Sequence, residues 1–182
     1  MTAPSVATPP PGRPAVPAHL VLLANLVVTA FMTGVIWYVQ LVHYPLMAGW
    51  PHDGFGAWES LHRDRTGWIV MPVMLVEGAT AALLLLRRPT RGSAWLPWLA
   101  ALLLAGVWAS TFLVQVPCHA RLSLGWDESV HAQLVATNWI RTALWTARLG
   151  VVTALAAGWM AACNPSCTAP QTSLTSPPGS GW

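Results

Sequence analysis

Four long apolar stretches constrain the fold of this chain more than any other feature. They lie near residues 20–44, 68–86, 95–116 and 138–163. Each approaches the roughly 20 residues that an α-helix needs to cross about 30 Å of hydrocarbon. Only 8% of the residues are charged and 54% are hydrophobic, whereas a typical soluble domain has roughly 25% charged residues. We therefore predict an all-α bundle of four transmembrane helices.

The two ends of the chain differ in composition from the apolar stretches. Residues 1–18 and 164–182 are rich in proline and small residues, a composition that buries too little apolar surface to order a chain. We expect a single domain, residues 19–163, between two disordered ends. The first apolar stretch, of about 25 residues, exceeds the roughly 7–15 of a signal-peptide apolar region. This length favours a transmembrane helix over a cleaved signal.

Arginine placement predicts the orientation of the bundle. The chain has no lysine, and three of its nine arginines, Arg87, Arg88 and Arg91, lie in the short connection between the second and third stretches. Short basic connections remain in the cytoplasm. We therefore expect both termini in the cytoplasm and the two longer connections outside, in the inner membrane of a bacterium. We interpret the arginine cluster as a topology signal and expect no nucleic-acid partner.

Two parts of the chain repeat a polar pattern. A glutamine is followed ten or eleven residues later by a tryptophan, and after fifteen more residues by an Arg-Thr pair. Such a pattern arises either by chance or by duplication of a two-helix unit. Duplication would relate the halves by an axis normal to the membrane and place Gln40 and His43 opposite Gln115 and His119.

Two charged residues fall inside the apolar stretches. Glu77 lies nine residues after Trp68 and ten before Arg87, so it sits near the bilayer centre, where an acid costs about 2.5–3.5 kcal/mol. The uncharged run after Arg148 has only fifteen residues, about 22 Å of helix, which is too short to cross alone. Arg148 is thus expected in the hydrocarbon, paired with Glu77.

Polar residues recur at helical spacing in three of the stretches. Asn138, Arg141, Trp145 and Arg148 share one face because they are spaced three, four and three residues apart. We expect these faces to line one pocket that opens outward, with Glu77 at its floor and His43 within about 10 Å of His119. The alternative is purely structural: interhelical hydrogen bonds worth about 1 kcal/mol each or less. The expected binding residues are Trp37, Gln40, Tyr44, Glu77, Gln115, Asn138 and Trp145, whereas His52 and His131 are expected to be solvated in the connections.

Two motifs in the second half carry a family resemblance. They read Val116-Pro117-Cys118-His119-Ala120-Arg121-Leu122 and Asn138-Trp139-Ile140-Arg141-Thr142. With the four-span layout, they resemble the V-P-x-[NH]-x-x-L and N-x-x-R-T pattern of the anthrone-oxygenase-like family of small membrane proteins. The chain departs from it by His119, where many relatives have asparagine, and by VQLVHYP in the first stretch, which indicates a separate branch. The resemblance implies a four-helix fold and, for a few members, oxidation of anthrones by dioxygen without metal or flavin.

Three functional classes follow from these residues. In the enzyme hypothesis, His43 or His119 removes a carbon-bound proton from a flat lipophilic compound, because imidazole accepts protons near neutral pH. Gln40 and Gln115 would orient the base or the substrate, and Arg141 or Arg148 would hold the developing oxyanion.

The other two classes are not enzymes. One is a metal or haem carrier with His43, His119 and His62 as nitrogen ligands and Glu77 as an oxygen ligand or its supporting partner. The other is a non-catalytic membrane subunit or small transporter in which Glu77 binds a proton or cation. The three cysteines match no zinc spacing, so we expect no metal site there. The cofactor and the oligomeric state remain open at this point.

Overall fold

The computed structural model describes residues 17–87 and 94–163, which form four helical segments without any strand in those ranges. The first segment comprises α1 (Ala18–Tyr38), the π-helix η1 (Val39–His43) and α2 (Tyr44–Met47), and the second is α3 (Phe55–Arg87). The third comprises α4 (Leu96–Ser110), the π-helix η2 (Thr111–Gln115) and α5 (Val116–Leu122), and the fourth is α6 (Glu128–Cys163). Most of the two ends that were expected to be disordered lies outside the described residues; only residues 17 and 18 of the N-terminal segment are described. Arg88 and Arg91 also lie outside the described residues.

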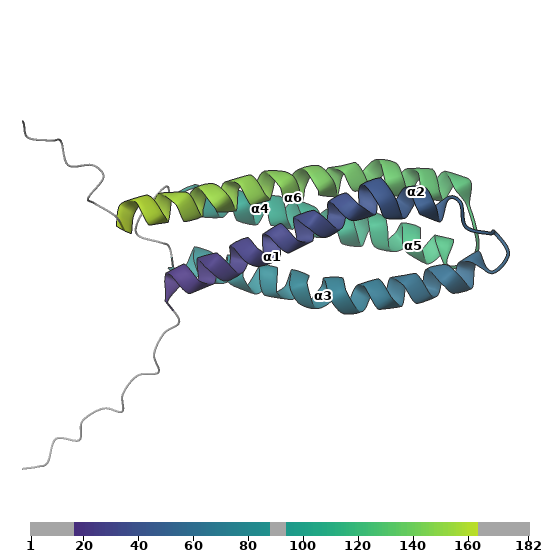
Figure 1. Ribbon diagram of the computed structural model, residues 1–182, viewed down its shortest axis with the longest axis horizontal. Coiled ribbons are helices and arrows are strands. Elements are labelled where there is room, and N and C mark those ends of the chain that lie inside the picture. The colour runs from purple at the N-terminus through teal and green to yellow at the C-terminus, as the bar shows by residue number, and fades with distance from the viewer. Residues whose placement is uncertain (1–16, 88–93, 164–182) are drawn as a thin grey trace, which may run out of the picture.

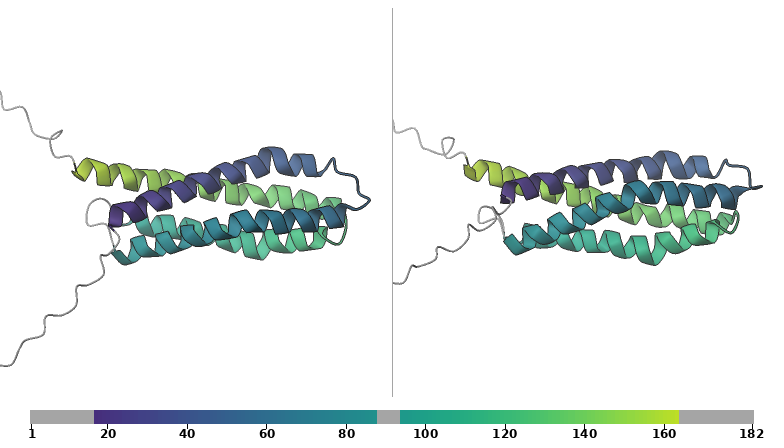
Figure 2. Two further views of the ribbon diagram at one scale, coloured as in Figure 1. Left: turned by 60° about the horizontal axis from the view of Figure 1, so that its bottom comes forward. Right: turned by 90° about the horizontal axis from the view of Figure 1, so that it is seen from below.

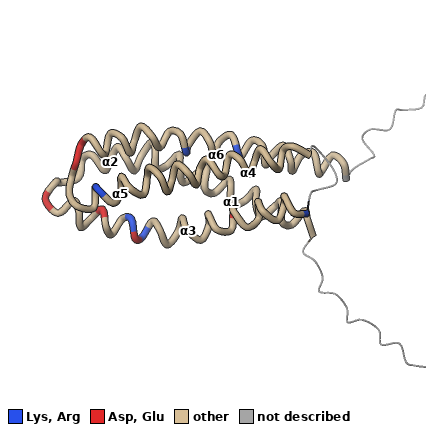
Figure 3. The backbone as a smooth tube through the Cα atoms, turned by 180° about the vertical axis from the view of Figure 1, so that it is seen from behind, with Lys and Arg blue, Asp and Glu red and all other residues tan. Residues whose placement is uncertain are grey.

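The segments form an elongated antiparallel bundle (Figures 1 and 2). Helix α1 packs against α3 and α6, and α4 completes the ring by contacting α3 and α6. We call the end with residues 48–54 and 123–127 the loop end, and the end where α1 begins and α6 ends the terminal end. Charged residues gather mainly at the loop end (Figure 3).

All four segments are long and apolar enough to cross a membrane. Their outward faces carry many exposed large apolar side chains, which suits contact with lipid. The prediction of an all-helical bundle of four segments, each long and apolar enough to span a membrane, is therefore confirmed.

The helices are longer than the apolar stretches that predicted them. Helix α3 has 33 residues, about 50 Å at 1.5 Å per residue, whereas the apolar stretch begins only at Trp68. Residues 55–67 of α3 continue past the apolar part because Phe55 and Glu59 are buried against the other segments. At Gly56 the approach is so close that a Cβ atom would lie 2.7 Å from the carbonyl oxygen of Ser123.

Each π-helix ends two residues before a proline, Pro45 or Pro117. Proline lacks the N–H that would bond four residues back, and a π-bulge accommodates the disrupted ladder. The helical segments continue through both prolines, because η1 and η2 accommodate the disrupted hydrogen bonds. Both π-helices contain a buried glutamine, Gln40 or Gln115.

Three apolar clusters build the core. One lies at the loop end around Tyr44, Phe55 and Leu122, a second lies mid-bundle around Met32 and Trp145, and a third lies at the terminal end. Polar side chains are buried between these clusters, and they form the two networks described next.

Candidate functional site

The first polar network surrounds Glu77 and Arg148, which form a fully buried ion pair with 2.9 Å between Nε and Oε1. The ion pair expected from the sequence is thus present. Glu77 Oε1 also accepts a hydrogen bond from Thr29 over 2.8 Å, and its Oε2 accepts one from the indole of Trp145 over 3.2 Å. Both carboxylate oxygens therefore have partners.

The guanidinium of Arg148 also donates to several hydrogen-bond partners. It donates to the carbonyl oxygen of Ala100 and, over 3.1 Å, to Asn25 Oδ1. Asn25 in turn donates to Thr80 Oγ1 over 2.8 Å. The network joins α1, α3, α4 and α6, so it ties all four segments together.

The second network lies nearer the loop end and centres on His119. Its Nδ1 lies 2.5 Å from Oε1 of Glu59, whose side chain is fully buried. Its Nε2 lies 3.2 Å from the hydroxyl of Tyr44, which is also buried. A carboxylate that accepts from Nδ1–H fixes the tautomer in which Nε2 is a proton acceptor. Glu59 on α3 and His119 on α5 thus form an oriented acid–imidazole pair.

Arg141 of α6 extends this network toward the middle of the bundle. Its Nη2 donates to Asn138 Oδ1 over 2.6 Å, to Gln115 Oε1 over 3.3 Å and to the Tyr44 hydroxyl over 3.4 Å. Behind it, Asn138 donates to Gln40 Oε1 over 2.7 Å. Among the described residues, no carboxylate is a hydrogen-bond partner of this buried guanidinium, so it retains a positive charge available to a ligand.

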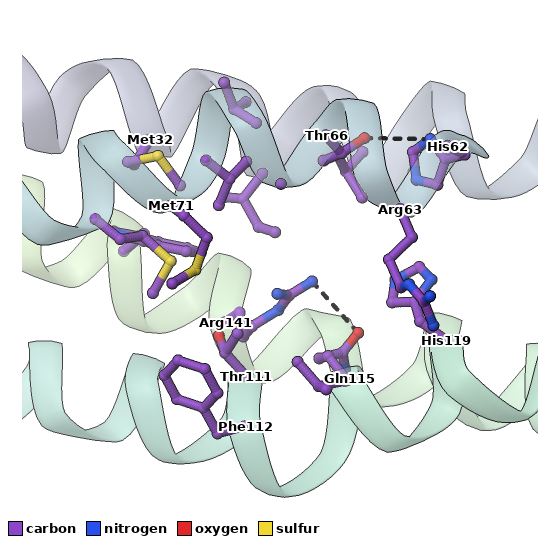
Figure 4. Close-up of a pocket in the computed structure, with 18 of the residues that line it drawn as sticks. Met32, His62, Arg63, Thr66, Met71, Thr111, Phe112, Gln115, His119 and Arg141 are labelled. Atoms are coloured by element: carbon purple, nitrogen blue, oxygen red, sulfur yellow. Dashed lines mark hydrogen bonds between the residues drawn. The ribbon is translucent and has the colours of Figure 1, made fainter. Parts of the chain in front are cut away.

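A pocket of about 250 Å³ lies between the two networks. Its walls are mostly apolar side chains of α1, α3, η2 and α6. Figure 4 shows Arg141 and Gln115 in the central wall, with His62, Arg63 and His119 at one end and Met32 and Met71 at the other. A mostly apolar pocket with a few convergent polar groups is the usual form of a small-molecule site.

The predicted site residues divide into four groups by position. Five of them line the pocket: Tyr44, Gln115, His119, Arg141 and Trp145. Gln40 and Asn138 lie behind Arg141 in its hydrogen-bond network, and Glu77 and Arg148 belong to the other network. Glu77 lies behind Trp145 and does not itself line the pocket floor.

His43 and Trp37 lie outside the pocket lining. The His43 ring stacks on His62 at 4.2 Å, and the His62 ring lies 6.0 Å from His119. His62 therefore stands between the two histidines that were expected to face each other. Trp37 is 38% exposed on the outer surface and donates to Thr146 over 3.0 Å, so it faces the surroundings of the bundle.

Glu59 was missed from the sequence, and His62 was considered only as a metal or haem ligand. Both fall before the apolar stretch that begins at Trp68, but both lie on α3, and His62 lines the pocket. Their spacing, Glu59-Ser60-Leu61-His62, is an E-x-x-H pattern on one helical face. His131 corrects a further expectation: it is buried on α6, with Nε2 3.1 Å from the carbonyl oxygen of Tyr44, whereas His52 is exposed as expected.

Among the described residues, no group of three or more histidine, cysteine, aspartate or glutamate side chains is arranged to hold a metal ion.

No protein-family model, no curated protein and no solved structure matches the chain. The functional argument therefore rests on the geometry of the pocket.

Proposed function

We propose that this protein is a membrane-embedded enzyme in which His119 acts as a general base on a lipophilic aromatic compound, in the manner of a cofactor-free oxygenase. The observation that carries the proposal is the position of His119 on the pocket wall, between the buried carboxylate of Glu59 and the hydroxyl of Tyr44. A buried carboxylate orients the imidazole and stabilises the imidazolium that forms when it takes a proton.

The chemistry suits a ring methylene that is conjugated, through the flanking aromatic rings, with a ring carbonyl. Nε2 of His119 removes one methylene proton, and the electron pair moves to the carbonyl oxygen. Arg141 and Tyr44 are placed to stabilise that oxyanion, because charge-assisted hydrogen bonds in a dry site act strongly on developing charge. Dioxygen then adds to the carbanion, and the peroxide anion takes the proton from the His119 imidazolium. The hydroperoxide loses its terminal OH together with the second methylene hydrogen as water. The methylene and one dioxygen thus become a carbonyl and one water, with no external reductant.

The resemblance to the anthrone-oxygenase-like family supports this substrate class, although many relatives have asparagine at the position of His119. We also propose that the termini are cytoplasmic, that the loop end faces outward, and that the membrane is a bacterial inner membrane. The basic connection after Arg87 supports this orientation.

A further proposal is that the halves arose by duplication. The π-helix followed by a proline in both halves supports it. Alignment by the prolines pairs Gln115 with His43, and not with Gln40 as the sequence pattern suggested.

The test uses the purified protein in lipid nanodiscs with 1,8-dihydroxyanthrone. We expect oxygen consumption and quinone absorbance above the rate of empty nanodiscs. His119→Gln should lower kcat by about 10²–10⁴, the usual contribution of a general base. His52→Gln, at an exposed histidine outside the pocket, is the matched control. Wild-type rates equal to those of empty nanodiscs, or an unaffected His119→Gln variant, would overturn the proposal.

No specific observation favours the other two classes. The oxygens of Glu77 are already bonded to Thr29, Arg148 and Trp145, which suits a structural ion pair better than a proton or cation site. His43, His62 and His119 are near one another, but they are stacked or tilted ring to ring, and this does not direct three nitrogen lone pairs at one point.

A further inference from the structure

Three apolar residues of the pocket lining are also exposed on the outer surface of the bundle. They are Met71 of α3, Phe112 of η2 and Val116 of α5, with 40%, 44% and 47% of their surface exposed. A residue that lines a pocket and also faces outward marks a rim. The pocket therefore opens sideways, between α3 and the η2–α5 segment (Figure 4).

The depth of this rim follows from the residues of α3. Arg63, Asp64 and Arg65 are exposed charged residues toward the loop end, and Trp68, 81% exposed, follows one turn later. Exposed tryptophan is typical of the membrane interface. Met71 lies three residues further, about 4.5 Å toward the bilayer centre. The opening thus faces the acyl chains just below the interface.

The pocket is polar at one end and apolar at the other. His62, Arg63 and His119 lie at the end nearer the interface, whereas Met32, Met74 and Trp145 lie deeper. A ligand whose polar atoms stay near the interface while its ring system lies among acyl chains has the same polarity gradient. Such a molecule can move sideways into the pocket without turning over.

The absence of a side chain at Gly67 leaves open space for that ligand. A Cβ atom added there would meet no atom within 4 Å. The space beside Gly67 is therefore open, and Gly67 lines the pocket together with Arg63 and Met71.

We infer that the pocket takes an amphipathic, lipid-soluble ring compound directly from the bilayer, through an opening rimmed by Met71, Phe112 and Val116. The inference names the ligand class and entry route of the proposed active site and rests on that proposal for the site's role. Binding and entry are nevertheless measurable without turnover.

The site is tested with Gly67→Leu, which extends a side chain into this open space beside the pocket lining. The probe is 1,8-dihydroxyanthraquinone, an unreactive coloured ring compound, titrated into nanodiscs that contain the protein. We expect at least about tenfold weaker binding, since a single methylene in a pocket already changes affinity by about that factor. Gly150→Leu is the matched control, because Gly150 on α6 also has open space at its Cβ and lies outside the pocket. Gly67→Ala, the smaller change, should give an intermediate loss.

The route is tested by stopped-flow binding of the same probe to a Met71→Trp, Phe112→Trp double variant. A narrowed rim should slow association and dissociation together and leave the equilibrium affinity nearly unchanged. Leu102→Trp, at an exposed position of α4 away from the rim, should bind at the wild-type rate.

Unchanged affinity in Gly67→Leu would overturn the site, and unchanged rates in the double variant would overturn the route. Probe binding that depends on Gly67 without any anthrone turnover would refute the proposed oxygenase activity and leave this inference standing.

Discussion

Trp145 donates its indole N–H to Oε2 of Glu77 over 3.2 Å while its ring forms part of the pocket wall. One side chain thus connects the buried ion-pair network to the candidate site. Because Glu77 accepts hydrogen bonds from Asn25 and Thr29 of α1 and from Trp145 and Arg148 of α6, it fixes the position of Trp145. The deeper network therefore supports the wall on which a ligand would rest.

The contributions of Glu77 and Arg148 to the free energy of unfolding should be coupled. Glu77→Gln alone leaves a buried guanidinium without its counter-charge, which typically costs about 3–5 kcal/mol. The double change with Arg148→Met removes both charges, so its loss should be smaller than the sum of the single losses. Thermal unfolding in detergent measures all four proteins. Strictly additive losses would show that the two charges do not interact.

Glu59 should act as a positioning residue for His119. Glu59→Gln keeps the size of the side chain but removes the charge that stabilises the imidazolium, so kcat for anthrone oxidation should fall by about 10²-fold or more while KM changes little. Glu59→Asp should restore part of the activity. Glu128→Gln, at an exposed glutamate of the first turn of α6, is the control. A parallel rise in KM would indicate a binding role instead.

Arg141 should not be replaceable by lysine. The guanidinium bonds Asn138, Gln115 and Tyr44 at once, and a single ammonium group cannot reproduce that planar fork. Arg141→Lys should therefore weaken binding of the anthraquinone probe and lower the free energy of unfolding by about 1–3 kcal/mol, the cost of leaving buried partners unsatisfied. Nanodisc titration and thermal unfolding check the two effects. Wild-type behaviour in both would mean that only the charge matters.

The features that could be predicted from the sequence are those that follow from hydropathy: the apolar helices and the charged residues within them. An apolar stretch that is long enough to cross hydrocarbon predicts its helix, and a charge within that stretch must find a partner, so Glu77 and Arg148 could be paired in advance. Glu59 and His62 could not be placed in this way, because they lie in the part of α3 that precedes the apolar stretch, where hydropathy does not indicate a helix. Only the E-x-x-H spacing carried a signal there. His131 was likewise assigned to a connection because α6 begins ten residues before its apolar stretch.

The π-helices were not predictable for a different reason. A π-bulge changes which face a residue presents, so the helical spacing used for Gln40, His43 and Tyr44 fails across η1. Gln40 and Tyr44 are buried, whereas His43 turns toward His62 at the side of the site. The prolines at positions 45 and 117 marked a local irregularity but did not specify its form.

The orientation of the bundle is testable with reporter fusions. The basic connection that begins at Arg87 should keep the terminal end in the cytoplasm. A C-terminal green fluorescent protein fusion should therefore fluoresce, and an alkaline phosphatase fusion at the same position should be inactive. The reverse pair of results would place the loop end, with its Glu59–His119 pair, on the cytoplasmic side.

Asp127, at the start of α6, should make the stability of the folded protein decrease at acidic pH. Its Oδ1 accepts hydrogen bonds from the Val130 amide over 3.1 Å and from the Ser129 hydroxyl over 2.6 Å. The Ser129 hydroxyl chiefly, and then the Val130 amide, hold the pKa of the Asp127 carboxyl below its ordinary value. A folded pKa below the unfolded one means that the stabilisation is complete above the unfolded pKa of about 3.9 and is lost as the pH falls through the folded pKa.

Asp127→Asn keeps a capping oxygen but cannot ionise, so its unfolding temperature should lie below that of the wild type at pH 6 and approach it as the pH falls below about 4. Ser129→Ala removes the hydroxyl that most lowers the pKa and should therefore show a smaller acid-dependent loss than the wild type. Thermal unfolding in detergent across this pH range measures the effect. Wild-type and Asp127→Asn curves that stay parallel down to pH 3 would mean that the carboxylate charge contributes nothing to the start of α6, since only a group with different pKa values in the folded and unfolded chain can make stability depend on pH.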